Sequence, residues 1–378
     1  MKEDLALRIL SQIMKWDDER ARTEFAWLRL MARLKYDGYR DFQAGMRFLE
    51  SLAVWLQQFD AEERETAYIF VRQTLTYVGA AELQRLVEQF YPRTVRDRLH
   101  RMVATECRIP PYRVLVDERA RVAYEELRRK TLFMGLSDGA RIDVVRHSTV
   151  GLLSNEQLVI ATQVDQDKWK DLLESLRDDL KDGAAQFKLI YLIDDFAGTG
   201  TSFFRYNEEK CKWTGKLMRF RDSLENALQT VPDVLADGWQ LCAHHYLASA
   251  AAKEAMAQRL DEARTVLASP WWTQNLQISF GSVFPSDFPL MWERDQEFIA
   301  LTEKYYDPII RTKHTNVGGA THLGLGYGGC ALPLVLEHNT PNNSVALLWA
   351  ETEGGMRADL DAPAPAMRAL FRRRQRHS

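Results

Sequence analysis

The chain has 378 residues, of which 46% are hydrophobic and 27% charged, and its formal net charge at pH 7 is -3. This composition is typical of folded globular proteins and excludes a chain that is disordered throughout. The small net charge excludes attraction to nucleic acid or membrane by an overall field, so any such contact needs a local patch. The length predicts two domains.

The four cysteines are widely spaced and form no Cys-x-x-Cys motif, which argues against a disulfide framework and a zinc site. They are Cys107, Cys211, Cys242 and Cys330. Residues 1–20 mix charged and apolar side chains, unlike a signal peptide, and no run approaches the roughly 20 apolar residues that span a bilayer. We therefore expect reduced thiols, a cytoplasmic location and no contact with a membrane.

Apolar residues recur at helical spacing in the first part of the chain, which predicts an all-α domain over residues 1–126. Within it, two helical segments at 81–90 and 95–103 precede a short extended segment at 112–116, an order that suits a winged helix. The second segment carries a basic cluster: Arg93, Arg96, Arg98, His100 and Arg101. The cluster suits contact with a nucleic-acid backbone, a protein-docking surface or a solvated helix face.

The pattern changes near Pro110-Pro111, a linker signal. Short apolar runs then alternate with amphipathic helices, which predicts a parallel α/β sheet in a domain over residues 127–378. Strands are expected at 131–136, 158–164, 187–193, 240–248 and 276–283, with helices at 169–180 and 251–267. The run at 187–193 is apolar enough for a central strand buried on both faces. The chain ends in a basic tail from Arg368, which we expect to be solvated or to contact nucleic acid.

The strongest local signal is the segment Lys188 to Ser202, in which an apolar run ends in two acids and a turn of small residues. Its polar parts are the acids Asp194 and Asp195, the glycines Gly198 and Gly200, and the hydroxyls of Thr199, Thr201 and Ser202. Ligands of open α/β sheets collect at the carboxyl ends of strands. Glycines allow close approach of the backbone, and the N–H groups of a following helix start favour an anion. Two carboxylates would repel a phosphate unless they hold ribose hydroxyls or Mg²⁺.

Competing motifs fit this segment less well. A P-loop ends in Gly-Lys-Ser/Thr, and the lysine is absent here. The acidic strand of a P-loop ATPase requires a phosphate loop upstream, and the chain has none. The acidic pair of a polymerase would not need the Gly-Thr-Gly-Thr that follows.

The segment resembles the phosphoribosyl pyrophosphate motif of type I phosphoribosyltransferases. The resemblance implies that Asp194 and Asp195 hold the ribose hydroxyls with Mg²⁺, and that the loop from Gly198 to Ser202 binds the 5-phosphate. An earlier segment, 133–141, is similar in position to the family's pyrophosphate loop, which implies that Asp138 and Arg141 face pyrophosphate. A plain turn explains that earlier segment equally well.

A wider similarity involves the segments 135–143 and 332–344 together with the helical front. They resemble a phosphoribosyltransferase-like family of bacterial conflict systems, with members in anti-phage defence and at retron loci. The resemblance implies an effector that binds phosphoribosyl pyrophosphate or a ribonucleotide and acts at ribose C1. It also implies a protein or nucleic-acid partner for the helical domain, such as a retron reverse transcriptase or its DNA. The alternative is a non-catalytic nucleotide sensor with a DNA- or protein-binding helical domain.

A polar cluster lies between two apolar runs, 332–336 and 345–349, which we expect to be strands. His338 would supply an acid–base group for a glycosidic-bond step, and Asn339 and Asn343 would read a base edge. The same residue types also stabilise tight turns. The tandem pair His244-His245 should point to opposite faces of a strand, one histidine packed and the other solvated.

Overall fold

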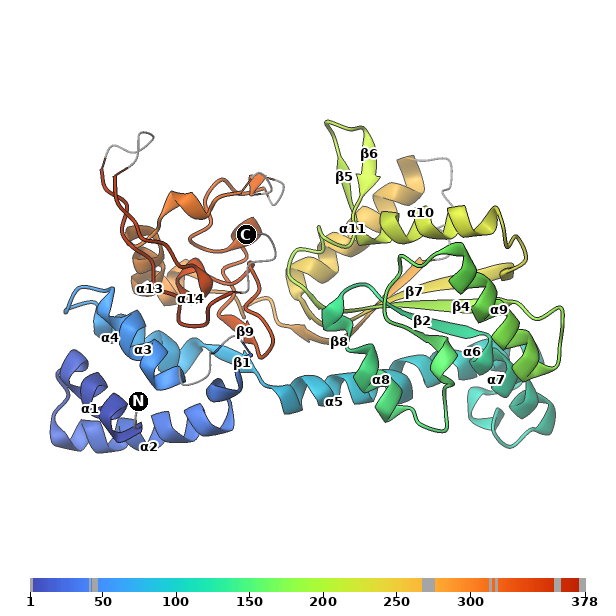
Figure 1. Ribbon diagram of the computed structural model, residues 1–378, viewed down its shortest axis with the longest axis horizontal. Coiled ribbons are helices and arrows are strands. Elements are labelled where there is room, and N and C mark those ends of the chain that lie inside the picture. The colour runs from blue at the N-terminus through green and yellow to red at the C-terminus, as the bar shows by residue number, and fades with distance from the viewer. Residues whose placement is uncertain are drawn as a thin grey trace. The chain divides into compact units, whose positions relative to one another are not determined.

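The computed structural model describes residues 3–40, 42, 47–266, 276–312, 315–316, 319–356 and 362–373. It confirms the α/β fold class, with a five-stranded parallel sheet (Figure 1). The chain divides into two compact units. We call Leu83–Phe284 the sheet unit, and Met1–Glu82 with Pro285–Ser378 the helical unit. Within these described ranges, no helix is both long and apolar enough to cross a membrane.

The sheet unit is built on five parallel strands in the order β3-β2-β4-β7-β8. Their bounds are β2 Thr131–Gly135, β3 Leu158–Val159, β4 Phe187–Ala197, β7 Leu235–Ser249 and β8 Leu276–Phe284. From β2 the chain first adds β3 on one side and then β4 on the other, so the strand order reverses between β2 and β4. Open sheets bind their ligands at such a point, outside the carboxyl ends of the strands.

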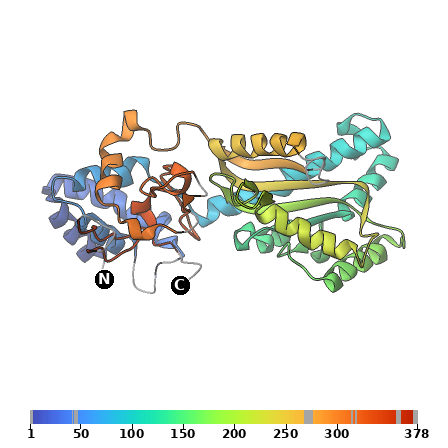
Figure 2. The ribbon, with the colours of Figure 1, turned by 90° about the horizontal axis from the view of Figure 1, so that it is seen from above.

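Helices cover both faces of this sheet (Figure 2). One face packs against α9 Gln166–Leu180, α10 Lys216–Leu228 and α11 Ala250–Val266. The other packs against α5 Ala80–Phe90, α6 Arg96–Cys107, α7 Glu118–Arg129 and α8 Ile142–Ser148. Successive residues of one strand enter opposite cores, as Ile190 and Tyr191 do on β4, because side chains alternate along a strand.

The winged-helix arrangement suggested by the sequence does not form in this part of the chain. The expected extended segment is instead a 3-10 turn, Pro111–Arg113, that leads into α7. The apolar sides of α5 and α6 are buried against the sheet, with Phe90 and Leu99 in the same core as Tyr191. These helices therefore belong to the α/β layer structure, and the expected boundary at residue 126 falls inside the sheet unit.

The helical unit combines the two ends of the chain. Its N-terminal elements are α1 Glu3–Met14, α2 Asp18–Leu34, α3 Phe48–Gln57, α4 Arg64–Ile69 and β1 Thr76–Val78. Its C-terminal elements are α13 Trp292–Lys304, β9 Leu334–Leu336 and α14 Ala346–Trp349, and β9 pairs with β1 in parallel. The segment 345–349 is therefore mostly helix, where a strand was expected.

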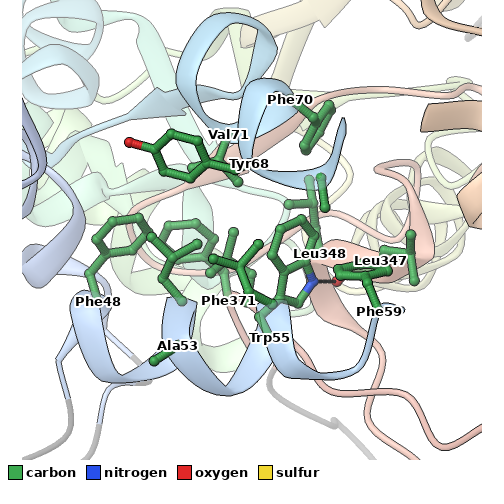
Figure 3. Packing of buried hydrophobic residues seen from close by; sticks show 14 of the residues in the cluster. Phe48, Ala53, Trp55, Phe59, Tyr68, Phe70, Val71, Leu347, Leu348 and Phe371 are labelled. Carbon is green, nitrogen blue, oxygen red and sulfur yellow. Dashed lines mark hydrogen bonds between the residues drawn. The ribbon is translucent and has the colours of Figure 1, made fainter. Parts of the chain in front are cut away.

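One aromatic core joins these two ends (Figure 3). The Nε1–H of Trp55 donates to the carbonyl oxygen of Leu347 at 2.7 Å, and the ring of Phe371 stacks on Phe48 with 5.7 Å between centroids. The C-terminal segment thus completes a helical core. The sequence had predicted instead that it would belong to the sheet domain. The expected basic tail is partly held as well, since Arg372 pairs with Glu351 at 3.2 Å, whereas Arg374, Arg376 and His377 lie outside the described residues.

Replacing Phe371 by alanine should destabilise the helical unit. The ring is fully buried, and truncating a buried phenylalanine costs about 3–5 kcal/mol. Chemical denaturation with amide hydrogen exchange should show the loss in α3, with β4 unaffected. The exposed aromatic Tyr112 provides the control, because Tyr112→Ala should change the free energy of unfolding by less than about 0.5 kcal/mol. Loss of protection in β4 rather than α3 would contradict this division of the chain.

Both histidines of β7 are buried, which corrects the expectation that one is solvated. His244 packs on Phe90 and His245 lies near Phe203, in opposite cores, because β7 is covered on both faces. Burial lowers the pKa of His244 to about 3, and burial together with the charge of Lys216 lowers the pKa of His245 to about 3. Both side chains are therefore neutral in the folded protein.

Acid should destabilise the sheet unit below about pH 6.5. In this range His244 and His245 become protonated in the unfolded chain but stay neutral in the folded protein. Because the pKa of each histidine is lower in the folded than in the unfolded state, its contribution to the free energy of unfolding is complete above pH 6.5 and decreases below it. It falls by about 1.4 kcal/mol per pH unit for each histidine. Urea denaturation between pH 7.5 and 5.5 measures this slope. His244→Asn should roughly halve it and the exposed His147→Gln should leave it unchanged, whereas equal slopes in all three proteins would refute the explanation.

Candidate functional site

The acid pair lies where the strand order reverses. Asp194 and Asp195 are in the carboxyl-terminal half of β4, with β2 on one side and β7 on the other, where Asp194 is in register with His245. The preceding residues of β4 are buried on both faces, as the apolar sequence predicted. The sheet therefore fixes the backbone of both acids at the edge where open sheets bind ligands.

Asp194 is held from two sides and is only 1% exposed. The hydroxyl of Ser137, in the turn after β2, donates to Oδ1, and the ammonium of Lys216, the first residue of α10, donates to Oδ2. Burial raises the pKa of Asp194 and the charge of Asp195 adds to that rise, while Lys216 and Ser137 counteract it. Each carboxylate oxygen thus has a donor inside the protein.

Asp195 is half-buried and lies against the turn that follows β2. Its Oδ1 accepts from the N–H of Phe196 at 2.9 Å, and a Cβ placed on Gly139 would lie 2.2 Å from Oδ2. Only glycine permits this approach. Strand β7 holds this turn in place, because the hydroxyl of Tyr246 donates to the carbonyl oxygen of Ala140 at 2.9 Å.

The backbone from Gly198 to Ser202, which we call the 198–202 bend, turns all of its carbonyl groups toward the protein. Each carbonyl oxygen accepts a hydrogen bond. The donors are Ser249 Oγ for Gly198 (2.6 Å), Arg259 Nη1 for Thr199 (3.1 Å), Phe203 N for Gly200 (3.1 Å), Arg205 Nη1 for Thr201 (2.9 Å) and Lys216 N for Ser202 (3.0 Å). In a trans peptide the N–H points opposite to the preceding C=O. The N–H groups of residues 199–202 therefore point away from these donors. The N–H of Thr201 bonds to the hydroxyl of Thr199 at 3.3 Å, and the N–H groups of residues 199, 200 and 202 form an array that favours an anion.

The helix expected directly after the bend begins later. A two-stranded hairpin, β5 Arg205–Asn207 and β6 Lys212–Thr214, intervenes before α10. The first turn nevertheless forms, since the N–H of Phe203 bonds to Gly200, and the N–H groups of Lys216 and Leu217 then bond to the carbonyls of Ser202 and Phe203. The hairpin is thus inserted into a helical turn that begins at the bend and continues into α10.

Asp138 and Arg141 occupy the turn after β2, next to the acid pair. Asp138 is exposed, whereas Arg141 is half-buried and begins α8 with a left-handed backbone at φ 49°. The structure therefore brings the acids, the bend and this turn together in the sheet unit.

The C-terminal candidates belong to the helical unit and are described there alone. Asn343 is 8% exposed and its amide donates to the carbonyl oxygen of Tyr327 at 3.0 Å, which supports the turn-stabilising interpretation. After β9, Nδ1 of His338 lies 3.7 Å from Oε1 of Glu337. Leu336 and Asn339 close a tight turn there through two hydrogen bonds between their backbones. A role of His338 or Asn339 in chemistry stays a prediction.

Sequence reasoning missed residues that build this site, among them Ser137, Lys216, Ser249 and Arg259. Ser137 lies in the segment 133–141, in which the predicted ligand-facing residues were Asp138 and Arg141. Lys216, Ser249 and Arg259 carry no local signal, because each reaches the site from a separate element through the fold. Among the described residues, no group of three or more His, Cys, Asp or Glu side chains could hold a metal ion.

A family model described as PRTase-CE matches residues 52–373, which includes the acid pair, the bend and most of the chain. No curated protein and no solved structure matches the chain.

The contact between Gly139 and Asp195 predicts the effect of a single methyl group. Gly139→Ala should displace the carboxylate and weaken by about 10-fold the binding of ribose 5-phosphate, the ligand that the sequence resemblance implies, because a hydrogen bond to a charged group is lost. Isothermal calorimetry measures the affinity. Gly183→Ala is the matched control, since no atom of the sheet unit lies within 4 Å of a Cβ at that position. Equal affinities in the two variants would count against the proposed placement of Asp195.

Proposed function

Because the chain belongs to the PRTase-CE family, whose members are phosphoribosyltransferase-like, we propose that the sheet unit binds phosphoribosyl pyrophosphate or a ribonucleotide and acts at ribose C1. The observation that carries this proposal is the orientation of the 198–202 bend. Its five carbonyl groups accept hydrogen bonds from the protein, which turns the N–H groups of residues 199, 200 and 202 toward the opposite side. A 5-phosphate is the ligand that such an array of donors favours.

The acid beside this array suits the sugar of the same ligand. Asp195 is the less buried member of the pair, and a carboxylate accepts hydrogen bonds from both hydroxyls of a ribose. With the phosphate on the bend and the hydroxyls on Asp195, the ribose ring is fixed at both ends. Such fixing aligns C1 for substitution and lowers the entropic part of the barrier.

In the proposed reaction, the bond between C1 and the departing oxygen breaks and its electron pair leaves with pyrophosphate or the base. A nucleophile then bonds to C1, which passes through an oxocarbenium-like state. We assign the guanidinium of Arg141, in the turn after β2, to the negatively charged leaving group, and the N–H groups of that turn would add to its stabilisation. Asp138 is exposed in the same turn, and we assign it to the pyrophosphate end.

Mg²⁺ fits this site as a companion of the ligand. Both oxygens of Asp194 already accept from protein donors, whereas Mg²⁺ needs only one or two carboxylates when phosphate oxygens and water complete its shell. Asp195 is the acid that would hold it. Bound there, Mg²⁺ would neutralise charge on the departing pyrophosphate.

We further propose that the protein is an effector of a bacterial anti-phage defence system. This setting rests on the resemblance of the sequence segments 135–143 and 332–344. The helical unit, which contains both chain ends, would then receive a protein or nucleic-acid partner. A sensor that binds the nucleotide without turnover is the second candidate, since the cradle for phosphate and ribose serves either purpose.

Purified full-length protein should release pyrophosphate from phosphoribosyl pyrophosphate, or base from a ribonucleotide, in the presence of Mg²⁺. Asp195→Asn should reduce turnover by about 100-fold, because it removes a charged acceptor from the transition state. Phosphorus NMR and chromatography follow the products. The control is Asp171→Asn, an exposed acid on α9 whose loss should leave the rate unchanged.

The outcomes separate the candidates. Turnover that depends on Asp195 supports the enzyme. Binding by calorimetry without turnover supports the sensor, and no binding of any ribose 5-phosphate compound contradicts both.

A further inference from the structure

Lys216 is tied to both halves of the site. Its backbone N–H donates to the carbonyl oxygen of Ser202 in the bend at 3.0 Å, and its ammonium donates to Asp194. The side chain is 17% exposed and that of Asp194 is 2% exposed, so the pair is largely withdrawn from water. One residue therefore links the position of the bend to the charge of the acid pair.

The charges around the pair show what Lys216 compensates. Asp194 and Asp195 are adjacent on β4, and two carboxylates at one strand end repel each other and any phosphate nearby. Ser137 contributes a neutral donor, and His245 on the neighbouring strand is buried and neutral. Arg205 and Arg259 donate to carbonyl oxygens of the bend. Lys216 is the cation that contacts Asp194, and Arg141 lies in the turn beside Asp195.

We infer that Lys216 is the internal counter-ion of Asp194: it occupies the place of a protein-bound divalent cation and leaves Asp195 as the acid that meets the ribose. The inference rests on the proposed function for its ligand. It makes Lys216 and Asp194 positioning residues, since they hold the bend and Asp195 without touching the reacting atoms.

The hairpin β5–β6 supports this role. The hairpin is inserted between Phe204 and Lys216, yet the N–H groups at the start of α10 donate to the carbonyl oxygens of Ser202 and Phe203. Lys216 is thereby the first residue of α10 and stands at the bend. A buried ion pair brings little net stability, because desolvation offsets the attraction, so stability alone does not account for it.

Removing the ammonium should convert the acid pair into a cation site. We expect wild-type protein without nucleotide to bind Mn²⁺ weakly, and Lys216→Gln to gain one Mn²⁺ site with a dissociation constant lowered by about 10-fold or more. Electron paramagnetic resonance of free Mn²⁺ measures the affinity. Lys216→Arg should behave like wild type, and adding Asp194→Asn to Lys216→Gln should abolish the gain. A folded Lys216→Gln protein that binds Mn²⁺ no better than wild type would overturn the inference.

A melting curve covers the case in which Lys216→Gln folds poorly. Mn²⁺ should raise the melting temperature of this variant by about 5 °C and leave that of wild type unchanged, because a cation that binds only the folded state stabilises it. An equal response of the two proteins would overturn the inference. These measurements use no nucleotide, so they judge Lys216 whether or not phosphoribosyl pyrophosphate binds.

Once nucleotide binding is established, the two acids can be told apart. The double variant Asp194→Asn/Lys216→Gln should bind phosphoribosyl pyrophosphate more tightly than Asp195→Asn does, since its uncharged pair fills the same space and keeps Asp195. Asp195→Asn should bind much more weakly. A double variant as weak as Asp195→Asn would overturn the assignment of the ribose to Asp195.

Discussion

The buried carboxylate of Asp194 is the constraint around which the sheet unit's site is arranged. A carboxylate that is 1% exposed must be matched by donors, because an unpaired buried charge is strongly unfavourable. The donors come from the turn after β2 and from the start of α10, so one group joins three segments that are distant in sequence. Satisfying this carboxylate sets where Asp195 and the 198–202 bend can lie.

The layers around the site explain why it is rigid. Strand β4 has neighbours on both sides and helices on both faces, so its backbone has no freedom to move the acids. The bend is fixed by its carbonyl groups, each of which accepts from the protein. The N–H groups of residues 199, 200 and 202 thus have a set orientation, and a preorganised anion site of this kind needs no rearrangement on binding.

The sequence predicted those parts of the fold whose pattern is local. The run at 187–193 identified a central strand because burial on both faces demands a continuous apolar segment, and the two acids after it identified the ligand edge. The expectations failed where distant segments decide. Residues 345–348 are all buried, and a short apolar run of that kind does not distinguish strand from helix. Their partner is α3, some 290 residues earlier, through the hydrogen bond from Trp55 to Leu347. Likewise Lys216 lies beyond a hairpin, and only the folded chain brings it to Asp194.

The central claim is that the N–H groups of residues 199, 200 and 202 receive the phosphate of a ribose 5-phosphate compound. The most direct measurement is a titration of isotope-labelled protein with ribose 5-phosphate, followed through the backbone amide resonances. The account predicts saturable downfield shifts of the Gly200 and Ser202 amide protons, with smaller changes at Gly139. Amides of the bend that stay unmoved while the ligand binds elsewhere would contradict it.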